Sequence, residues 1–178
     1  MKKLILSSLV LFTALFSKAQ SGNNQISVAA EVGIPTGDFA EGFNTGFGGS
    51  VKGLYGVGNS GQITFTTGYT TYKAKGNTSD YSASFNIIPF LAGFRLLMNG
   101  FYIEPQAGYG IYAASVKIMG EKASSSEGAF TYAGGIGYAN NKIDIGVRYQ
   151  GATQDGDSFG LIGIHLGYNF SASPANKK

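Results

Sequence analysis

Eight stretches of the chain alternate bulky apolar residues with small or polar ones at a period of two, which is the pattern of a β-strand with two different faces. No helical period follows residue 19. Glycine-, asparagine- and proline-rich segments separate the stretches, as expected for turns and loops. The predicted strands span residues 25–34, 46–58, 62–74, 82–98, 101–117, 128–139, 142–150 and 161–170.

The turn at Asn99-Gly100 sets the register of the two longest predicted strands. Asn-Gly between two alternating runs is typical of a two-residue type I′ turn, because both central positions need a positive φ. Residues whose numbers sum to 199 then face each other across the hairpin. This pairing places Arg95 opposite Glu104 and predicts an ion pair.

The two faces of the predicted strands differ in chemistry. One face is apolar and aromatic, and the other carries glycine, small polar residues and all the charges of the strand centres. A membrane barrel turns its bulky face to lipid and its small polar face to the lumen. The charges that we expect to form a lumen network are Glu31, Lys52, Arg95, Glu104, Asp144, Arg148 and His165.

Outward aromatic residues fall into two groups along the strands, as in the two interfacial girdles of membrane barrels. The group expected near the short turns is Tyr55, Phe101, Tyr138, Tyr168 and Phe170. The group expected nearer the loops is Phe47, Tyr69, Phe130, Tyr132 and Tyr149.

The connections alternate in length, which supports an up-and-down barrel. Long polar segments follow the first, third, fifth and seventh predicted strands, including residues 118–127 and 151–158. Two or three residues follow the second, fourth and sixth, with Gly61 expected in the left-handed conformation of the first short turn. The pattern predicts an all-β, eight-stranded antiparallel up-and-down transmembrane β-barrel with both chain ends on the short-turn side.

The first 19 residues change the charge of the chain. Lys2 and Lys3 precede an apolar run that ends at Phe16, followed by small residues, which predicts a secretory signal peptide over residues 1–19. Of 13 Lys and Arg against 10 Asp and Glu, three bases lie in this segment, so residues 20–178 carry no formal net charge. This balance disfavours nucleic acid as a partner. The chain has no cysteine, which excludes thiol catalysis and thiolate metal sites.

Several stretches resemble the small eight-stranded outer-membrane β-barrels of the OmpA/OmpX kind, with their porin-like "outer membrane protein beta-barrel" domains. They are residues 86–90, 101–108 and 166–170. The resemblance implies a Gram-negative outer-membrane location, insertion by the outer-membrane machinery and contact with lipopolysaccharide. The domain is expected over residues 20–170, followed by a polar tail over 171–178. Because proline cannot donate to a strand ladder, Pro89 and Pro105 predict bulges or local breaks.

Candidate chemistry in the chain is sparse. His165 is the only histidine and lies near Asp144 in the expected register, but no inward serine lies at that depth to act as a nucleophile. Asp155 and Asp157 in the last loop, with Asp38 and Glu41 in the first, could bind calcium, but they lack a calcium-loop spacing and are better read as a solvated acidic rim. No cofactor, metal site or catalytic residue is therefore predicted.

The sequence thus predicts a monomeric outer-membrane barrel with a charge-plugged lumen, acting as a structural or surface-interaction protein of the cell envelope and not as an enzyme. One alternative is a narrow porin-like channel for small solutes. Another is a soluble lipocalin-like ligand-binding barrel, but the aromatic face would overfill an eight-stranded interior.

Overall fold

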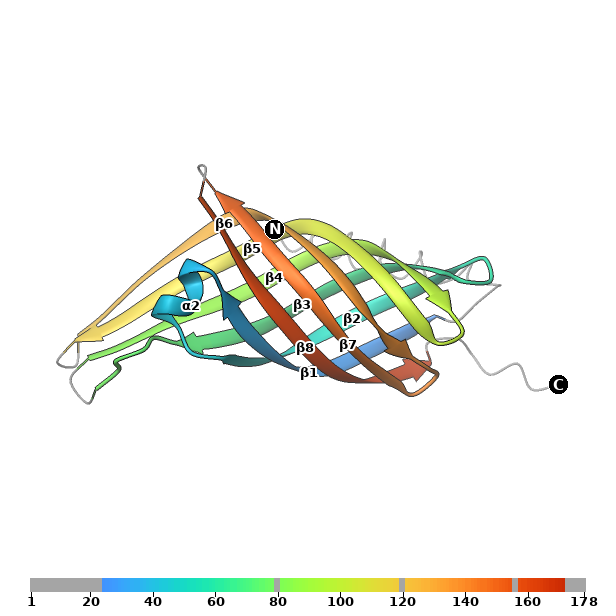
Figure 1. Cartoon of the computed structure of the whole chain (residues 1–178), viewed down its shortest axis with the longest axis horizontal. Coiled ribbons are helices and arrows are strands. Elements are labelled where there is room, and N and C mark those ends of the chain that lie inside the picture. The colour runs from blue at the N-terminus through green and yellow to red at the C-terminus, as the bar shows by residue number, and fades with distance from the viewer. Residues whose placement is uncertain (1–23, 79–80, 119–120, 155–156, 172–178) are drawn as a thin grey trace, which may run out of the picture.

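A computed structural model describes residues 24–78, 81–118, 121–154 and 157–171, and these form one closed barrel (Figure 1). Each strand pairs antiparallel with its neighbours in sequence, and the first pairs with the last. The fold prediction is confirmed. The expected signal segment, residues 1–19, and the tail beyond residue 171 lie outside the described residues. The strands are β1 (Gln25–Thr36), β2 (Gly46–Val57), β3 (Gly61–Lys73), β4 (Tyr81–Met98), β5 (Phe101–Ile118), β6 (Glu121–Ala139), β7 (Ile143–Gln154) and β8 (Asp157–Ser171).

The burial of side chains is the reverse of that in a water-soluble barrel. The outer wall is apolar, with Ile136 65% and Phe101 63% exposed. The interior is polar, and Arg95, Thr66 and Thr131 are each 0% exposed. This arrangement follows from the two-residue period, because every second side chain of each strand points into the lumen. Among the described residues, no helix is long and apolar enough to cross a membrane.

The β4–β5 hairpin has the predicted turn and register. Asn99 and Gly100 have φ values of 53° and 90°, as a type I′ turn requires. Met98 faces Phe101, and Gly93 faces Gln106, so the residue numbers of both pairs sum to 199 as predicted.

Pro89 and Pro105 produce local breaks in the ladder without a bulge. Pairing between β3 and β4 is interrupted around Pro89, and pairing between β4 and β5 is interrupted beside Pro105. The register is the same on both sides of each gap. A missing N–H removes a hydrogen bond but adds no residue, so the strands continue in phase.

The connections differ from the predicted pattern in four places. The predicted loops at 118–127 and 151–158 belong largely to strands, because β5–β6 pairing continues to Ile118 opposite Glu121 and β7–β8 pairing to Gln154 opposite Asp157. The first loop contains a short helix, α2 (Asp38–Gly42). The left-handed residue of the β2–β3 turn is Gly58 (φ 65°), since Gly61 already pairs with Val57.

The strands β4, β5 and β6 extend beyond the barrel wall as a small sheet, the outer sheet, formed by residues 81–86, 112–118 and 121–127 (Figure 1). Pairing of β6 with β7 begins only at Phe130, opposite Thr153. On the other side, the β3–β4 loop borders β4, because the side chain of Asn77 bonds both the N–H and the carbonyl of Ala83. The β4 edge of the outer sheet is therefore held by the β3–β4 loop, and the β6 edge is held by its pairing with β5.

Three outward tyrosines cover glycines on the next strand, which predicts one measurable effect. Tyr109 lies over Gly128, Tyr132 over Gly151 and Tyr149 over Gly160, so a side chain at any of these glycines would occupy the place of a ring. We expect Gly151→Ala to lower the free energy of unfolding by about 1–2 kcal/mol through displacement of Tyr132.

The matched control for this variant is Gly134→Ala, whose added methyl group meets no atom within 4 Å. Urea unfolding in lipid vesicles, followed by far-UV circular dichroism, measures both variants. Equal midpoints for the two variants would show that the tyrosine contact contributes nothing.

Candidate functional site

Arg95 on β4 lies at the centre of a buried network near the short-turn end of the lumen. Its Nε and Nη2 donate to Oε2 of Glu104 at 2.9 and 2.7 Å. Lys52 Nζ donates to the same oxygen at 2.9 Å, and Gln106 Nε2 donates to Oε1 of Glu104 at 2.9 Å. Glu104 thus balances two cations that are less than a tenth exposed. The side chains come from β2, β4 and β5, so the network spans the lumen.

Asp144 on β7 forms the other half of this network. Its Oδ2 lies 2.8 Å from Nη1 of Arg95, as a charge contact without the alignment of a hydrogen bond. Its Oδ1 accepts a 2.8 Å hydrogen bond from the Tyr102 hydroxyl and lies 3.2 Å from Nε2 of His165. The guanidinium of Arg95 also stacks over the Tyr102 ring, 3.7 Å from its centroid. Lys52, Arg95, Tyr102, Glu104, Gln106, Asp144 and His165 are called the inner network below.

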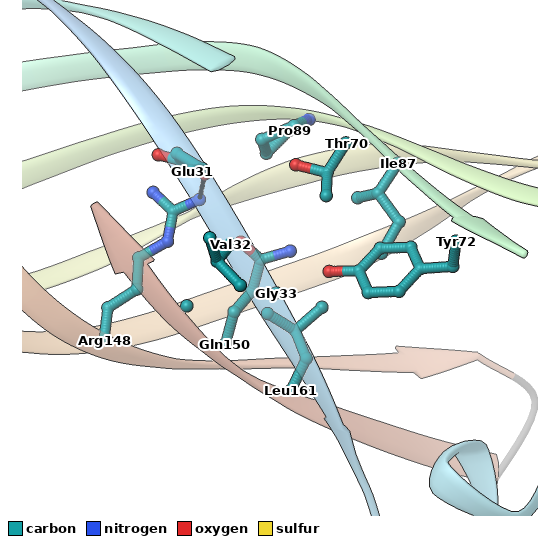
Figure 2. Close-up of a pocket in the computed structure, with 11 residues that line it drawn as sticks. Glu31, Val32, Gly33, Thr70, Tyr72, Ile87, Pro89, Arg148, Gln150 and Leu161 are labelled. Carbon is teal, nitrogen blue, oxygen red and sulfur yellow. Dashed lines mark hydrogen bonds and ion pairs between the residues drawn. The ribbon is translucent and has the colours of Figure 1, made fainter. Parts of the chain in front are cut away.

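A separate ion pair lies further toward the loops. Arg148 Nη2 donates to Oε2 of Glu31 at 2.9 Å. A small cavity borders this pair on the loop side and is also lined by Tyr72, Gln150 and Leu161 (Figure 2). It has room for roughly one water molecule.

A cluster of aromatic rings, the aromatic cap, lies at the loop end of the lumen beyond this cavity. Phe39 of α2 inserts among four rings, with centroids 4.8–5.4 Å from its own, and these rings pack on Tyr112, Ile87 and Leu161. Edge and tilted contacts of this kind stabilise a cluster beyond the area it buries. The rings of the cap belong to Phe39, Phe43, Tyr72, Phe85, Tyr112 and Phe159.

The structure brings the seven predicted lumen charges into two groups. Lys52, Arg95, Glu104, Asp144 and His165 meet in the inner network, and Glu31 pairs with Arg148 apart from them. Lys142 begins the predicted strand 142–150, where alternation with Ile143 predicts an inward side chain, but it is exposed in the turn before β7.

Sequence reasoning missed the polar partners of the inner network and the whole aromatic cap. On β5 the even-numbered side chains point into the lumen, so Tyr102 and Gln106 lie on the same face as Glu104. Tyr72 and Phe85 likewise lie on the inward faces of β3 and β4. Two-residue alternation along each strand would therefore have identified all four as inward residues. Phe39 carries no such signal, because it lies in a connection and not in a strand.

The ten aromatic residues predicted as girdles are all exposed on the outer wall. Exposure ranges from 38% at Tyr55 to 63% at Phe47 and Phe101. Two adjacent pairs, Phe101 with Tyr138 and Tyr168 with Phe170, contact edge to face at 5.4 and 4.9 Å.

His165 and Asp144 lie together, but the hydroxyl between them belongs to Tyr102, 3.1 Å from Nε2 of His165. A Ser-His-Asp site needs a nucleophilic serine bonded to the histidine, and the described residues provide none. Within the same residues, no group of three His, Asp or Glu side chains is placed to hold a metal ion. Asp155 and Gly156 of the candidate calcium loop lie outside the described residues.

Comparison with known proteins gives a consistent result. The family model described as "Outer membrane protein beta-barrel domain" matches residues 6–170. No curated protein matches the chain.

Among solved structures, the chain is similar to Ail, the attachment invasion locus protein of Yersinia pestis, in complex with the heparin analogue sucrose octasulfate. The two share 18% identity at a TM-score of 0.67, over 85% of this chain and 100% of Ail. The N-terminal β-barrel domain of Pseudomonas aeruginosa OprF is 14% identical to this chain at a TM-score of 0.59, and the match covers 84% of this chain and 100% of that domain. Neisserial surface protein A is 16% identical at a TM-score of 0.55, and the match covers 83% of this chain and 95% of that protein.

Proposed function

Because the chain belongs to the outer membrane protein beta-barrel domain family and lies in the outer membrane of a Gram-negative bacterium, we propose that it is a barrel with a closed lumen. In this proposal it acts as a structural or surface-interaction protein of the cell envelope, with no catalytic activity. Residues 1–19 direct its export, and the barrel domain over residues 20–170 is followed by the polar tail 171–178, whose first residue, Ser171, still pairs with Gln25 at the end of β8. The outer-membrane insertion machinery assembles it as a monomer.

The observation that supports the proposal is that buried side chains meet inside the lumen at three successive levels. The inner network lies at the short-turn end, the Glu31–Arg148 pair joins β1 to β7 further along, and the aromatic cap lies at the loop end. A cavity for roughly one water molecule borders the middle pair. A hydrated ion would have to displace paired charges at one end and packed rings at the other, and this favours a closed barrel over a channel.

The outer wall supports anchoring of the barrel in lipid. Each of the eight strands contributes exposed apolar residues to the outer wall, and the ten predicted girdle residues are among them. We assign Tyr55, Phe101, Tyr138, Tyr168 and Phe170 to the girdle at the short-turn interface. The girdle at the loop interface then consists of Phe47, Tyr69, Phe130, Tyr132 and Tyr149. Aromatic rings prefer these interfaces because they are apolar with a polar edge or hydroxyl.

Conductance in a planar lipid bilayer tests the closed lumen. We expect no stepwise current from the wild-type protein. Phe39→Ala, which opens only the cap, and Arg95→Ala with Glu104→Ala, which opens only the inner network, are each expected to remain silent. The variant that combines all three substitutions is expected to give discrete channels, because the central side chains of the inner network and the central ring of the cap are then removed together.

The alternative function, a narrow channel for small solutes, predicts a different result. Wild-type protein would then conduct, and Arg95→Ala with Glu104→Ala would change its ion selectivity. Lys142→Gln, at the exposed turn before β7, is the control that should leave either behaviour unchanged. Discrete current from the wild-type protein would overturn the closed-lumen proposal.

A further inference from the structure

The outward face of the outer sheet and the adjoining end of β3 carries three lysines and a row of serines, and we propose that this face binds the phosphate groups of lipopolysaccharide in the leaflet beside the barrel. The lysines are Lys73, Lys117 and Lys122, and all three are exposed. The proposal depends on the outer-membrane location of the chain and is independent of whether its lumen is closed.

Strand register places two of these lysines side by side. Lys117 on β5 lies directly opposite Lys122 on β6. Directly opposite side chains have Cβ atoms roughly 5 Å apart, and like charges in such a pair repel each other. A phosphate group carries one to two negative charges and several acceptor oxygens, so it can lie between two ammonium groups and replace their repulsion with attraction.

The next row on the same face extends the polar surface to β3. Lys73 lies opposite Ser84, Ser84 opposite Ser115, and Ser115 opposite Ser124. This row is two residues from the Lys117–Lys122 pair along each strand, so its hydroxyls face the same side. The face therefore presents hydrogen-bond donors from four adjacent strands.

The acidic residues of the outer sheet lie on its other face. Glu121 lies opposite Ile118 and Glu127 lies opposite Tyr112. By two-residue alternation, these positions are on the face that continues the lumen side of their strands. Among the described residues, no ion pair joins Lys73, Lys117 or Lys122 to a carboxylate. The separation of charge gives the outward face a positive potential that is complementary to an anion.

The position of the face relative to the wall selects the ligand. Lys73 is four residues beyond Tyr69 on the outward side of β3, and Lys117 is eight residues beyond Tyr109 on that of β5. At about 3.4 Å per residue these lysines lie roughly 14 and 27 Å further along their tilted strands than the aromatic residues. The face continues the lipid-facing wall outward, where it meets the headgroups and phosphorylated sugars of the neighbouring lipopolysaccharide and not the open solution above the barrel.

The test measures binding of purified lipopolysaccharide to the full-length protein refolded in detergent micelles. Each lysine near an anionic surface contributes about a fivefold factor in affinity, so Lys117→Gln with Lys122→Gln should weaken binding roughly 25-fold. Arginine at both positions should preserve binding, and Lys142→Gln at the opposite rim should have no effect. Chemically dephosphorylated lipopolysaccharide should bind the wild type at least as weakly as intact lipopolysaccharide binds the double glutamine variant, because Lys73 then also has no phosphate to bind.

Three results would overturn the proposal. The first is equal affinity of the wild type and the double glutamine variant for lipopolysaccharide. The second is unchanged wild-type binding after dephosphorylation. The third is loss of binding to soluble heparin, but not to lipopolysaccharide, in the glutamine variant, which would identify a free anionic glycan as the ligand. Electrophoretic mobility of unheated samples confirms that each variant is folded before binding is measured.

Discussion

Replacing Glu104 with alanine is expected to lower the free energy of unfolding of the barrel by about 3–5 kcal/mol, the cost of leaving a buried charge without its partner. Glu104 is the common acceptor of Arg95 and Lys52, whose side chains are 0% and 9% exposed. Without it, both cations remain in the lumen with Asp144 as the nearest acid. Urea unfolding in lipid vesicles measures the effect.

Two further variants test the cause of this loss. Arg95→Ala added to Glu104→Ala removes one charge of each sign and leaves Lys52 and Asp144 in balance, so part of the stability should return. Glu31→Ala removes the ion pair with Arg148 at a more exposed position and should cost only about 1–2 kcal/mol. A strictly additive double variant, or equal losses from Glu31→Ala and Glu104→Ala, would contradict the role of Glu104 as a shared counter-ion.

Replacing Ile164 with arginine is the second variant with a large expected effect. Ile164 lies on the outer wall of β8, 41% exposed, between Ile162 and the aromatic residues Tyr168 and Phe170. An arginine at this depth must enter hydrocarbon, which costs about 2–4 kcal/mol at the midplane of a bilayer. Unfolding of the variant in phospholipid vesicles should show this loss.

The control for this experiment is the same substitution at the tip of the outer sheet. Ile118 is 53% exposed at the end of β5, well beyond Tyr109, which lies opposite the girdle residue Phe130. Ile118→Arg should change the free energy of unfolding by no more than about 0.5 kcal/mol, as is usual for surface positions. Equal effects at the two positions would mean that the apolar wall does not contact lipid.

Most of the fold could be predicted because its signals are local. Asn99-Gly100 determines one register, and two-residue alternation then assigns each side chain to the wall or to the lumen. The interior position of Arg95, Glu104 and Asp144 follows from this alternation alone. A membrane barrel has few other ways to place a charge in the middle of a strand.

Partner choice across the lumen could not be predicted in the same way. Lys52 reaches Glu104 from β2 to β5, and Arg148 reaches Glu31 from β7 to β1. These distances depend on the stagger of the closed barrel, which alternation along single strands does not reveal. Only the Arg95–Glu104 pair, inside one hairpin, could be assigned from its turn.

The ends of the outer strands were mispredicted for a different reason. Residues 121–127 are polar and rich in serine, so they carry none of the apolar alternation that marks the strands of the wall. They pair because β5 continues beside them, and hairpin pairing needs no buried face when the backbone groups meet. Composition therefore shows where the lipid-facing band ends, but not where the strand ends.

The seam between β1 and β8 determines the order in which the chain can fold. All twelve residues of β1 pair with β8, from Gln25 opposite Ser171 to Thr36 opposite Gly160, whereas β1 shares nine pairs with β2. The seven other strand contacts form between neighbours in sequence, but this one needs both ends of the sheet to meet, and its loop-closure entropy is the largest in the molecule. Ring closure is therefore expected to be the slowest pairing step, and until it occurs the sheet has two unpaired edges, which favour pairing with other chains.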